Sequence, residues 1–219
     1  MGKTVMADHG QQNIKLYRVD PVTPKVSGFY RLLKRLADIA VGLSVAVFGA
    51  VPMLIIAALI KLDSKGPVIF RQERLGKDGK PFVMYKFRSM HVDAEVNGPQ
   101  WAEKKDDRCT RIGCILRKTR LDELPQFFNI LKGEMSLVGP RPERPYFYDQ
   151  FETYIHGFRN RLVVRPGLTG WAQVSGGYDL LPEEKIVYDM EYISKMSVGM
   201  DLRCIFKTVR LIFTHEGAR

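Results

Sequence analysis

Two adjacent acidic residues, Asp122 and Glu123, stand in a stretch of chain that is rich in cations, residues 117–126. Adjacent carboxylates suit phosphoryl transfer, because they can hold Mg²⁺ against substrate phosphates. A carboxylate can also attack phosphorus itself and form an acyl phosphate. A simpler interpretation is open as well. Pro125 fits the first turn of a helix, which would put Asp122 near the N-cap and Glu123 in the first turn, where acidic residues are ordinary caps.

Cationic residues on stiff segments favour the chemical interpretation. Lys86 and Arg88 stand at the end of an expected strand. Arg141 lies between two prolines after a glycine, and Arg165 begins a Pro-Gly turn. Because proline fixes the backbone, these loops would hold their guanidinium groups in place, and such groups match phosphate oxygens geometrically. Together with Arg117 they indicate a diphosphate site with a metal, although each of them singly is more often a surface charge.

Other nucleotide and metal motifs are missing from the sequence. It has no Gly-x4-Gly-Lys-Ser/Thr loop and no Gly-x-Gly-x-x-Gly fingerprint, so neither a P-loop nor a Rossmann site is indicated. The four histidines are scattered, and the three cysteines form neither a disulfide framework nor a CxxC pair, which favours a reducing cytosolic face. The net charge of +10 suits an anionic partner: nucleic acid, an anionic membrane or a phosphorylated substrate.

Residues 39–60 form an unbroken run of 22 uncharged, mostly apolar residues, and about 20 suffice to span a bilayer as a helix. Basic residues flank the run on both sides, and such residues favour the cytoplasmic side of a membrane. Pro52, a little past the middle, breaks or kinks a helix. These features favour a re-entrant helix–break–helix over its rival, a plain spanning helix. A buried core helix is disfavoured because the run lacks a polar face.

Two later segments carry apolar stripes at helical spacing. The first consists of Phe147, Phe151, Tyr154, Ile155 and Phe158. The second is interleaved with basic residues and consists of Leu202, Ile205, Phe206, Val209 and Phe213. Such a stripe can lie in a membrane interface or pack on the protein core, and the sequence leaves both alternatives open.

The remaining pattern predicts a compact α/β domain with more helix than strand. Residues 68–71 and 82–87 are typical of a hairpin around the Gly-Lys-Asp-Gly turn at 76–79. A further short strand is expected at 135–138, and a polar loop at 91–107. Helices are expected at 110–118, 124–132, 183–195 and 200–214.

The chain divides into four predicted regions. Residues 1–28 are polar and interrupted by proline, without the apolar core of a signal peptide, and we interpret them as a flexible leader. Residues 29–62 form the re-entrant membrane helix, residues 63–214 the catalytic domain and residues 215–219 a tail.

The sequence resembles the bacterial sugar transferases, small monotopic phosphoglycosyltransferases that act on undecaprenyl phosphate. Six motifs occur in the order of that family and cover roughly residues 30–214. They are Lys34-Arg35-Leu-Ala-Asp38, the segment 66–76, Lys86-Phe-Arg88-Ser-Met90, Leu121-Asp-Glu-Leu-Pro-Gln126, Ser136-Leu-Val-Gly-Pro-Arg-Pro142 and the segment 165–174.

The resemblance implies roles for the residues that match these motifs. Asp122 matches a nucleophile that takes a phosphosugar from a nucleotide diphosphate-sugar, and Glu123 matches its partner at Mg²⁺ or in proton handling. Positions that contact phosphate are matched by Lys86, Arg117 and Arg141, and less firmly by Arg88. Nucleotide or substrate contacts are expected of Arg165 and Gln173.

The family resemblance also implies partners and a location. The expected partners are a UDP-sugar, undecaprenyl phosphate and membrane lipid, while the oligomeric state stays open, with a homodimer as one alternative. The expected location is the bacterial inner membrane, with the catalytic domain on the cytoplasmic face. Pro52 matches the family's break, although Val51 stands where a serine is frequent, so Gly49 would share that role. Without the upstream helices of multi-span members, the chain looks like a minimal form.

Several alternatives stay open at this level. A membrane-tethered nucleic-acid binder would explain the charge, but no recognition motif supports it, so no nucleic acid is expected. A non-catalytic scaffold of a polysaccharide assembly complex is the other rival, which the intact Asp122-Glu123 pair argues against. The transferred sugar is not identified, and residues 143–165 and the turn at 176–178 are candidate specificity regions. The catalytic hypothesis requires Asp122 to lie near Arg117 and Arg141, beside room for a diphosphate.

Overall fold

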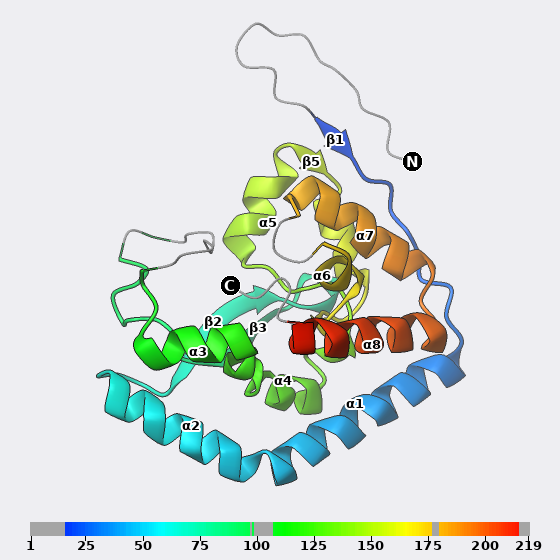
Figure 1. The fold of residues 1–219 in the computed structure, drawn as a ribbon. Helices are drawn as coiled ribbons and strands as arrows, with labels where there is room; N and C mark the ends of the chain where they lie inside the picture. Colours follow the sequence, from blue (N-terminus) through cyan, green and yellow to red (C-terminus); the bar gives the residue numbers. More distant parts are fainter. Residues whose placement is uncertain (1–15, 97, 99–106, 177–179, 215–219) are drawn as a thin grey trace, which may run out of the picture.

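A computed structural model of the chain describes residues 16–96, 98, 107–176 and 180–214 (Figure 1). Most of the predicted leader, part of the loop at 91–107, residues 177 and 178 of the candidate specificity turn, and the predicted tail lie outside these residues. Within them, helices predominate over short strands, which confirms a mixed α/β architecture rich in helix.

The apolar run forms two helices that meet at an angle. Helix α1 spans Gly28–Phe48, helix α2 spans Ala50–Asp63, and the two axes are bent by 61°. No single helix in the described ranges is long and apolar enough to cross a membrane, whereas this bent pair meets the criteria of length and composition when taken together. In Figure 1 the pair forms an angled base beneath the rest of the molecule.

The interruption lies at Gly49, which was expected to share the break, and not at Pro52, which stands in the first turn of α2. The first turn of a helix tolerates a proline because no N–H is needed there. The proline ring nevertheless clashes with the carbonyl group four residues earlier, so the preceding helix cannot continue through it. That carbonyl belongs to Phe48, the last residue of α1. Pro52 therefore accounts for the end of α1, and the bend itself falls one turn before the proline.

The predicted hairpin is confirmed, with longer strands than expected. Strand β2 (Ile69–Leu75) pairs antiparallel with β3 (Pro81–Phe87) through a turn at η1 (Lys77–Gly79). Two parallel pairs join distant parts of the chain: β4 (Ser136–Val138) with β6 (Gly167–Thr169), and β1 (Tyr17–Arg18) with β5 (Ile155–His156). Of these only β4 was predicted, because pairings of two or three residues leave no periodic signal in the sequence.

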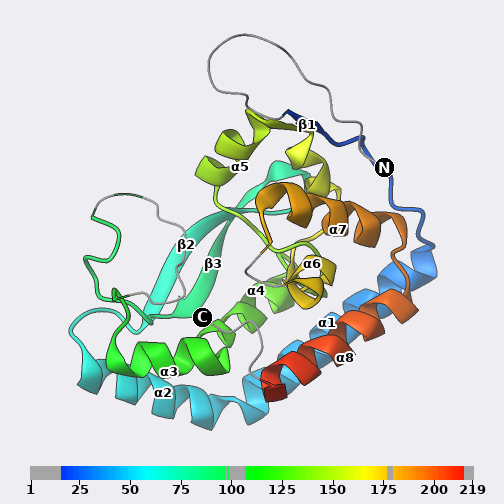
Figure 2. The same cartoon turned by 45° about the horizontal axis from the view of Figure 1, so that its top comes forward.

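The predicted helices are present with small shifts at their ends, and further short helices join them. The set comprises α3 (Arg111–Thr119), η2 (Leu121–Glu123), α4 (Gln126–Lys132), α5 (Pro145–Glu152), η3 (Phe158–Val163), α6 (Trp171–Ser175), α7 (Pro182–Ser194) and α8 (Val198–Thr214). Figure 2 shows α5, α6 and α7 gathered on one side of the hairpin, with α3 and α4 between the hairpin and the bent pair.

The first apolar stripe belongs to the protein core, which contradicts its alternative assignment to a membrane interface. Helix α5 ends at Glu152, so the stripe continues through β5 into η3 instead of following one helix. Phe151 and Phe158 pack edge to face with ring centroids 5.1 Å apart, and Ile155 and Phe158 are fully buried. The aromatic spacing therefore reflects core packing around two turns of chain.

The second stripe, on α8, is only partly at the surface: Ile205 is half-buried against the core, and the side chain of Phe213 lies outside the described part of the chain. Leu202, Phe206 and Val209 are exposed, and Phe206 keeps 71% of its surface accessible. The opposite side of α8 packs into the core through Met200 and Cys204. One face of α8 thus anchors the helix to the domain, while the other presents an apolar surface that is available for contact.

The Lys34-Arg35-x-x-Asp38 motif attaches α1 to the domain. The two terminal guanidinium nitrogens of Arg35 donate to the carbonyl groups of Ile130 and Leu131, at the end of α4, over 2.7 Å each. Asp38, which is buried, accepts hydrogen bonds from the main-chain nitrogen of Leu137 at 2.8 Å and from the hydroxyl of a neighbouring serine in β4. The motif therefore holds α1 against α4 and β4.

Asp38→Ala is expected to lower the free energy of unfolding by about 2 kcal/mol or more, because it leaves the N–H of Leu137 without an acceptor in the interior. Ser44→Ala is the matched control on the same helix, since the Ser44 hydroxyl is exposed and bonds only to its own helix at Ala40. Thermal unfolding in detergent measures both variants. Equal melting temperatures would show that the Asp38 contact contributes little.

Candidate active site

Asp122 and Glu123 lie in a turn of their own and do not cap α4. Arg120 adopts a left-handed conformation with φ of 59° and ends α3, and the chain then forms the single 3₁₀ turn η2. Pro125 is the residue that precedes α4, and it makes no side-chain capping bond. The simple capping interpretation is therefore wrong, because the acidic pair precedes the helix by a full turn.

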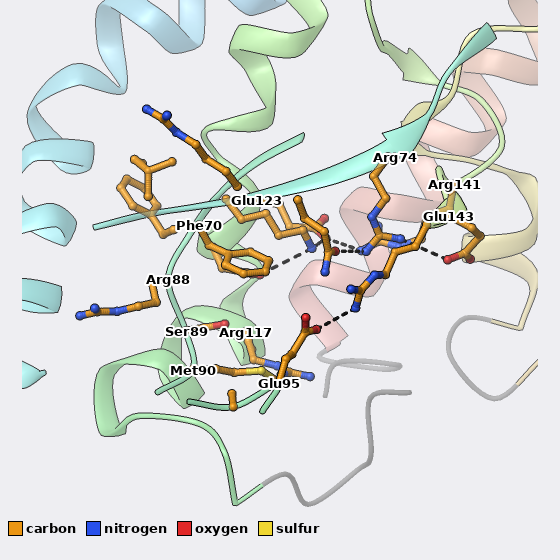
Figure 3. A pocket seen from close by; sticks show the side chains of 18 of the residues that line it. Phe70, Arg74, Arg88, Ser89, Met90, Glu95, Arg117, Glu123, Arg141 and Glu143 are labelled. Atoms are coloured by element: carbon orange, nitrogen blue, oxygen red, sulfur yellow. Dashed lines mark hydrogen bonds and ion pairs between the residues drawn. The ribbon is translucent and has the colours of Figure 1, made fainter. Parts of the chain in front are cut away.

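The carboxylate of Glu123 is clamped between two cations from distant segments. Its Oε1 accepts from Nζ of Lys86, in β3, at 3.0 Å and from Nη2 of Arg141, in the loop after β4, at 2.7 Å. Asp122 stands beside this clamp, with its Oδ2 4.0 Å from the same Lys86 Nζ. Figure 3 shows Glu123 and Arg141 directed toward each other across the pocket.

The two carboxyl groups have opposite pKa shifts. Burial raises the pKa of Asp122 to about 6, and the charge of Glu123 adds to this, against the opposing effects of Lys86, Arg141 and Arg117. Burial would also raise the pKa of Glu123, but Arg141 and Lys86 hold it well below its usual range. Glu123 is therefore a fixed anion near neutral pH, whereas Asp122 is an anion that burial has destabilised and made more reactive.

A large cationic cavity opens over this pair. Its volume is about 800 Å³, and among the described residues its lining contains eleven arginines and lysines against four carboxylates. Asp122, Arg117 and Arg141 all line it, as the catalytic hypothesis required. Such a cavity is large enough for a drug-sized ligand, and its charge favours an anion with several phosphate oxygens.

The chain matches the family described as "Bacterial sugar transferase" over residues 29–215. It belongs to the bacterial sugar transferase family.

Relatives of this family member carry consistent names. The chain is 48% identical over 197 residues to UDP-N-acetylgalactosamine-undecaprenyl-phosphate N-acetylgalactosaminephosphotransferase of Aeromonas hydrophila, covering 88% of this chain and 46% of that protein. It is 43% identical over 207 residues to UDP-glucose:undecaprenyl-phosphate glucose-1-phosphate transferase of Escherichia coli (strain K12), covering 90% of this chain and 45% of that protein. The chain thus spans about half the length of these two relatives.

A shorter relative matches along almost its whole length. Exopolysaccharide production protein PSS of Rhizobium leguminosarum bv. phaseoli is 44% identical over 187 residues, which cover 81% of this chain and 94% of that protein. The portion that this family member shares with its longer relatives therefore also occurs as a protein of similar size.

Arg88 serves a different purpose in this transferase family member from the phosphate contact that was expected. It borders the cavity, but its guanidinium group donates to the carbonyl groups of Ser64 and Lys65 at 2.8 and 2.7 Å. Only 5% of its surface is exposed, and Figure 3 shows its side chain directed away from Glu123. Arg88 therefore secures the turn that follows α2, while the anion-facing charges come from other residues.

Arg165 lies at the surface and does not line the cavity. The rigid turn that it begins supports the site indirectly. The N–H of Gly167 donates to the carbonyl of Pro140 at 2.9 Å, and the N–H of Gly139 donates to the carbonyl of Thr169 at 2.8 Å. The Arg-Pro-Gly segment thus braces the loop that carries Arg141, which explains its stiffness without a ligand contact from Arg165. Gln173, by contrast, does line the cavity.

Other lining residues were not predicted individually, although Glu143 and Arg161 fall within the candidate specificity region 143–165. Arg74 lies within the motif at 66–76, in β2, and Glu143 directly follows the motif that contains Arg141. Their place in or beside these motifs was the available signal for a role in the site. Lys185 on α7 and Arg161 in η3 gave no signal of their own, because a single basic residue in a helix usually faces water. Arg161 is almost fully buried, lies 2.7 Å from Asp189, and donates to the carbonyl of Arg141 at 2.8 Å.

The Asp122-Glu123 pair fits a magnesium ion only together with a substrate. In the described part of the chain no three histidine, cysteine, aspartate or glutamate side chains gather as a ligand set. Mg²⁺ is commonly held by one or two carboxylates, with substrate phosphates and water completing the shell. Two adjacent carboxylates bordering a cavity lined with cations meet that requirement once a diphosphate occupies the cavity.

Proposed function

We propose that this protein is a phosphoglycosyltransferase that moves a sugar-1-phosphate from a UDP-sugar to undecaprenyl phosphate. The observation that carries the proposal is the buried Asp122 carboxylate, with its raised pKa, beside a clamped Glu123 in a cavity lined with cations. The names of the relatives that match most of this chain support the same donor and acceptor classes.

The first step uses Asp122 as the nucleophile. A carboxylate oxygen attacks the phosphorus that bears the sugar, the bond from that phosphorus to the bridging oxygen breaks, and UMP leaves with the electron pair. The product on the enzyme is an aspartyl phosphosugar. Lys86, Arg117 and Arg141, which line the cavity, would bind the phosphate oxygens as charge moves onto the leaving group.

The second step regenerates the carboxylate. An oxygen of undecaprenyl phosphate attacks the same phosphorus, and the Asp122 carboxylate departs with its electron pair, giving undecaprenyl diphosphate-sugar. Glu123 orients Lys86 and Arg141 through both steps. Its low pKa makes it a poor proton acceptor, so the structure favours this anchoring role over proton handling.

Magnesium fits this scheme at the carboxylate pair. Asp122 and Glu123, with the donor's diphosphate oxygens, would hold the ion, which would supply charge neutralisation to the departing nucleotide.

The bent pair α1–α2 supports re-entry into a membrane from the cytoplasmic face. Arg35 fastens the first helix to α4, and the carboxylate of Asp63, at the end of the second helix, accepts from the N–H of Ile112 in α3 at 3.1 Å. Both ends therefore attach to the same domain, which suits a segment that enters and leaves on one side. The exposed apolar face of α8 would lie at the same membrane surface.

Release of UMP tests the function directly. Purified protein with undecaprenyl phosphate and Mg²⁺ is offered a panel of UDP-sugars, and UMP is measured. Intact mass spectrometry without the acceptor then looks for one phosphosugar adduct on Asp122. Release of no UMP from any donor would favour the rival interpretation, a non-catalytic scaffold of a polysaccharide assembly complex.

The rate of UMP release in a single turnover should fall as the pH is lowered through about 6. The carboxyl group of Asp122 has its pKa raised to about 6, so it becomes protonated below that pH and loses its attacking charge. Glu123 stays ionised in this pH range, so its titration does not contribute to the fall in rate. A rate that is constant between about pH 5 and 8 would contradict the assignment of Asp122 as the nucleophile.

A further inference from the structure

A second polar cluster lines the same cavity. We call the residues Arg74, Glu143, Gln173 and Lys185 the Glu143 cluster; all four border the cavity and come from β2, the loop after β4, α6 and α7. Glu143 and Lys185 expose only 7% and 9% of their surfaces. No step proposed above uses any of these side chains.

Glu143 is an ionised acceptor within this cluster. Its Oε2 lies 3.3 Å from Nη1 of Arg74, and its Oε1 lies 3.7 Å from Nζ of Lys185. Burial would raise the pKa of Glu143, but Lys185 and Arg74 lower it below its usual range. The Glu143–Lys185 separation is longer than a direct hydrogen bond, so a small polar group can bond to both.

Two atoms of the cluster are buried and lack a hydrogen-bond partner among the described residues. They are Nε of Arg74, a donor, and Oε1 of Gln173, an acceptor. The Nε2 atom of Gln173 donates to the carbonyl of Leu168 at 3.3 Å, and this bond fixes which end of the side-chain amide is the acceptor Oε1. Buried polar atoms are nearly always paired in folded proteins, so unpaired ones in the wall of a cavity point to a ligand.

The mixture of donors and acceptors selects the kind of ligand. A phosphate group only accepts hydrogen bonds, and the ionised Glu143 would repel it. A sugar hydroxyl both donates and accepts, so it can satisfy Glu143 or Gln173 on one side and Lys185 or Arg74 on the other. Glu143 follows Arg141 by two residues, and Figure 3 shows the Arg74–Glu143 pair next to Arg141.

We propose that the Glu143 cluster binds the hydroxylated ring of the sugar that is transferred. This proposal rests on the proposed function, in which the ring is joined through one oxygen to the phosphorus that Asp122 attacks. The ring must therefore lie beside the phosphate-binding cations, where the cluster is found. Uracil also donates and accepts hydrogen bonds, but it stands a ribose and a second phosphate away from that phosphorus.

Gln173→Leu and Lys185→Met test the proposal. Gln173→Leu removes an unpaired buried atom and keeps similar bulk, so it should fold normally. Each change is made in the Asp122→Asn protein, in which turnover is blocked, and calorimetry measures the binding of UDP-glucose, UDP-N-acetylgalactosamine and UMP. The Kd of at least one UDP-sugar should rise about tenfold or more, while the Kd of UMP should stay within about twofold.

Lys195→Met is the matched control, because Lys195 directly follows α7 and is exposed. It should leave every Kd unchanged. An equal rise in the Kd of UMP and of the UDP-sugars would assign the cluster to the nucleotide and overturn the proposal, as would unchanged binding of both. Failure of the proposed function would be recognised separately, because the unmodified protein would then release no UMP from any UDP-sugar.

Discussion

Asp122→Asn should reduce sugar-1-phosphate transfer by on the order of 10⁴-fold or more, because the amide cannot form the acyl phosphate through which the reaction is proposed to pass. The substitution is nearly isosteric, so Lys86, Glu123 and Arg141 keep their contacts. The measurement is the formation of undecaprenyl diphosphate-sugar from a labelled donor, with trapping of the phosphosugar adduct in parallel. Turnover near that of the unmodified protein would remove the covalent mechanism.

The same substitution should not weaken the fold. The pKa of Asp122 is raised in the folded state, so folding favours the protonated form, and the associated stability is lost as the pH rises through about 6. Above that pH the folded protein bears the free-energy cost of a buried, ionised Asp122, which a neutral asparagine removes. The free energy of unfolding of the variant at pH 7.5 should therefore be unchanged or higher, by up to about 1–3 kcal/mol. A variant that is inactive and at least as stable would locate the loss in the chemistry.

Glu123→Gln should lower transfer by about 10²–10³-fold, a loss typical of disturbed electrostatic groups in active sites. Glu123 is the shared anion of Lys86 and Arg141, and its neutral replacement leaves two half-buried cations to repel each other. The orientation of the phosphate-binding groups is then lost even though Asp122 remains. Kinetics of UMP release and of lipid product formation measure the effect.

The pH dependence of Glu123→Gln distinguishes this explanation from general misfolding. The negative charge of Glu123 raises the pKa of Asp122, so its removal should move the acidic limb of the residual rate below about pH 6. Asp149→Asn is the control, because Asp149 pairs with Arg159 at the surface and should leave rate and profile unchanged. An acidic limb that stays in place would show that the two carboxylates are not electrostatically coupled.

Local patterns in the sequence were sufficient for many of the elements. The hairpin, α3, α4, α7 and α8 were expected because their apolar spacing and turn residues repeat over a full element. The apolar run and its break were also expected, with the break displaced from Pro52 to Gly49 because proline disrupts the turn that precedes it. The aromatic spacing around α5 was ambiguous, because core and interface stripes have the same period.

The sequence by itself determined the chemical parts of this protein: an acidic pair, several stiff cationic loops and an apolar segment with basic flanks. Tertiary structure decided which of these parts meet. Glu123 is clamped by Lys86 and Arg141, 37 and 18 residues away in the chain. Arg88 instead donates to the turn after α2, and Arg165 lies exposed outside the cavity lining. The reason is physical: which element a side chain comes from follows from local pattern, but its burial and its partners depend on packing between distant segments. The raised pKa of Asp122 arises from that packing, since burial is its largest cause.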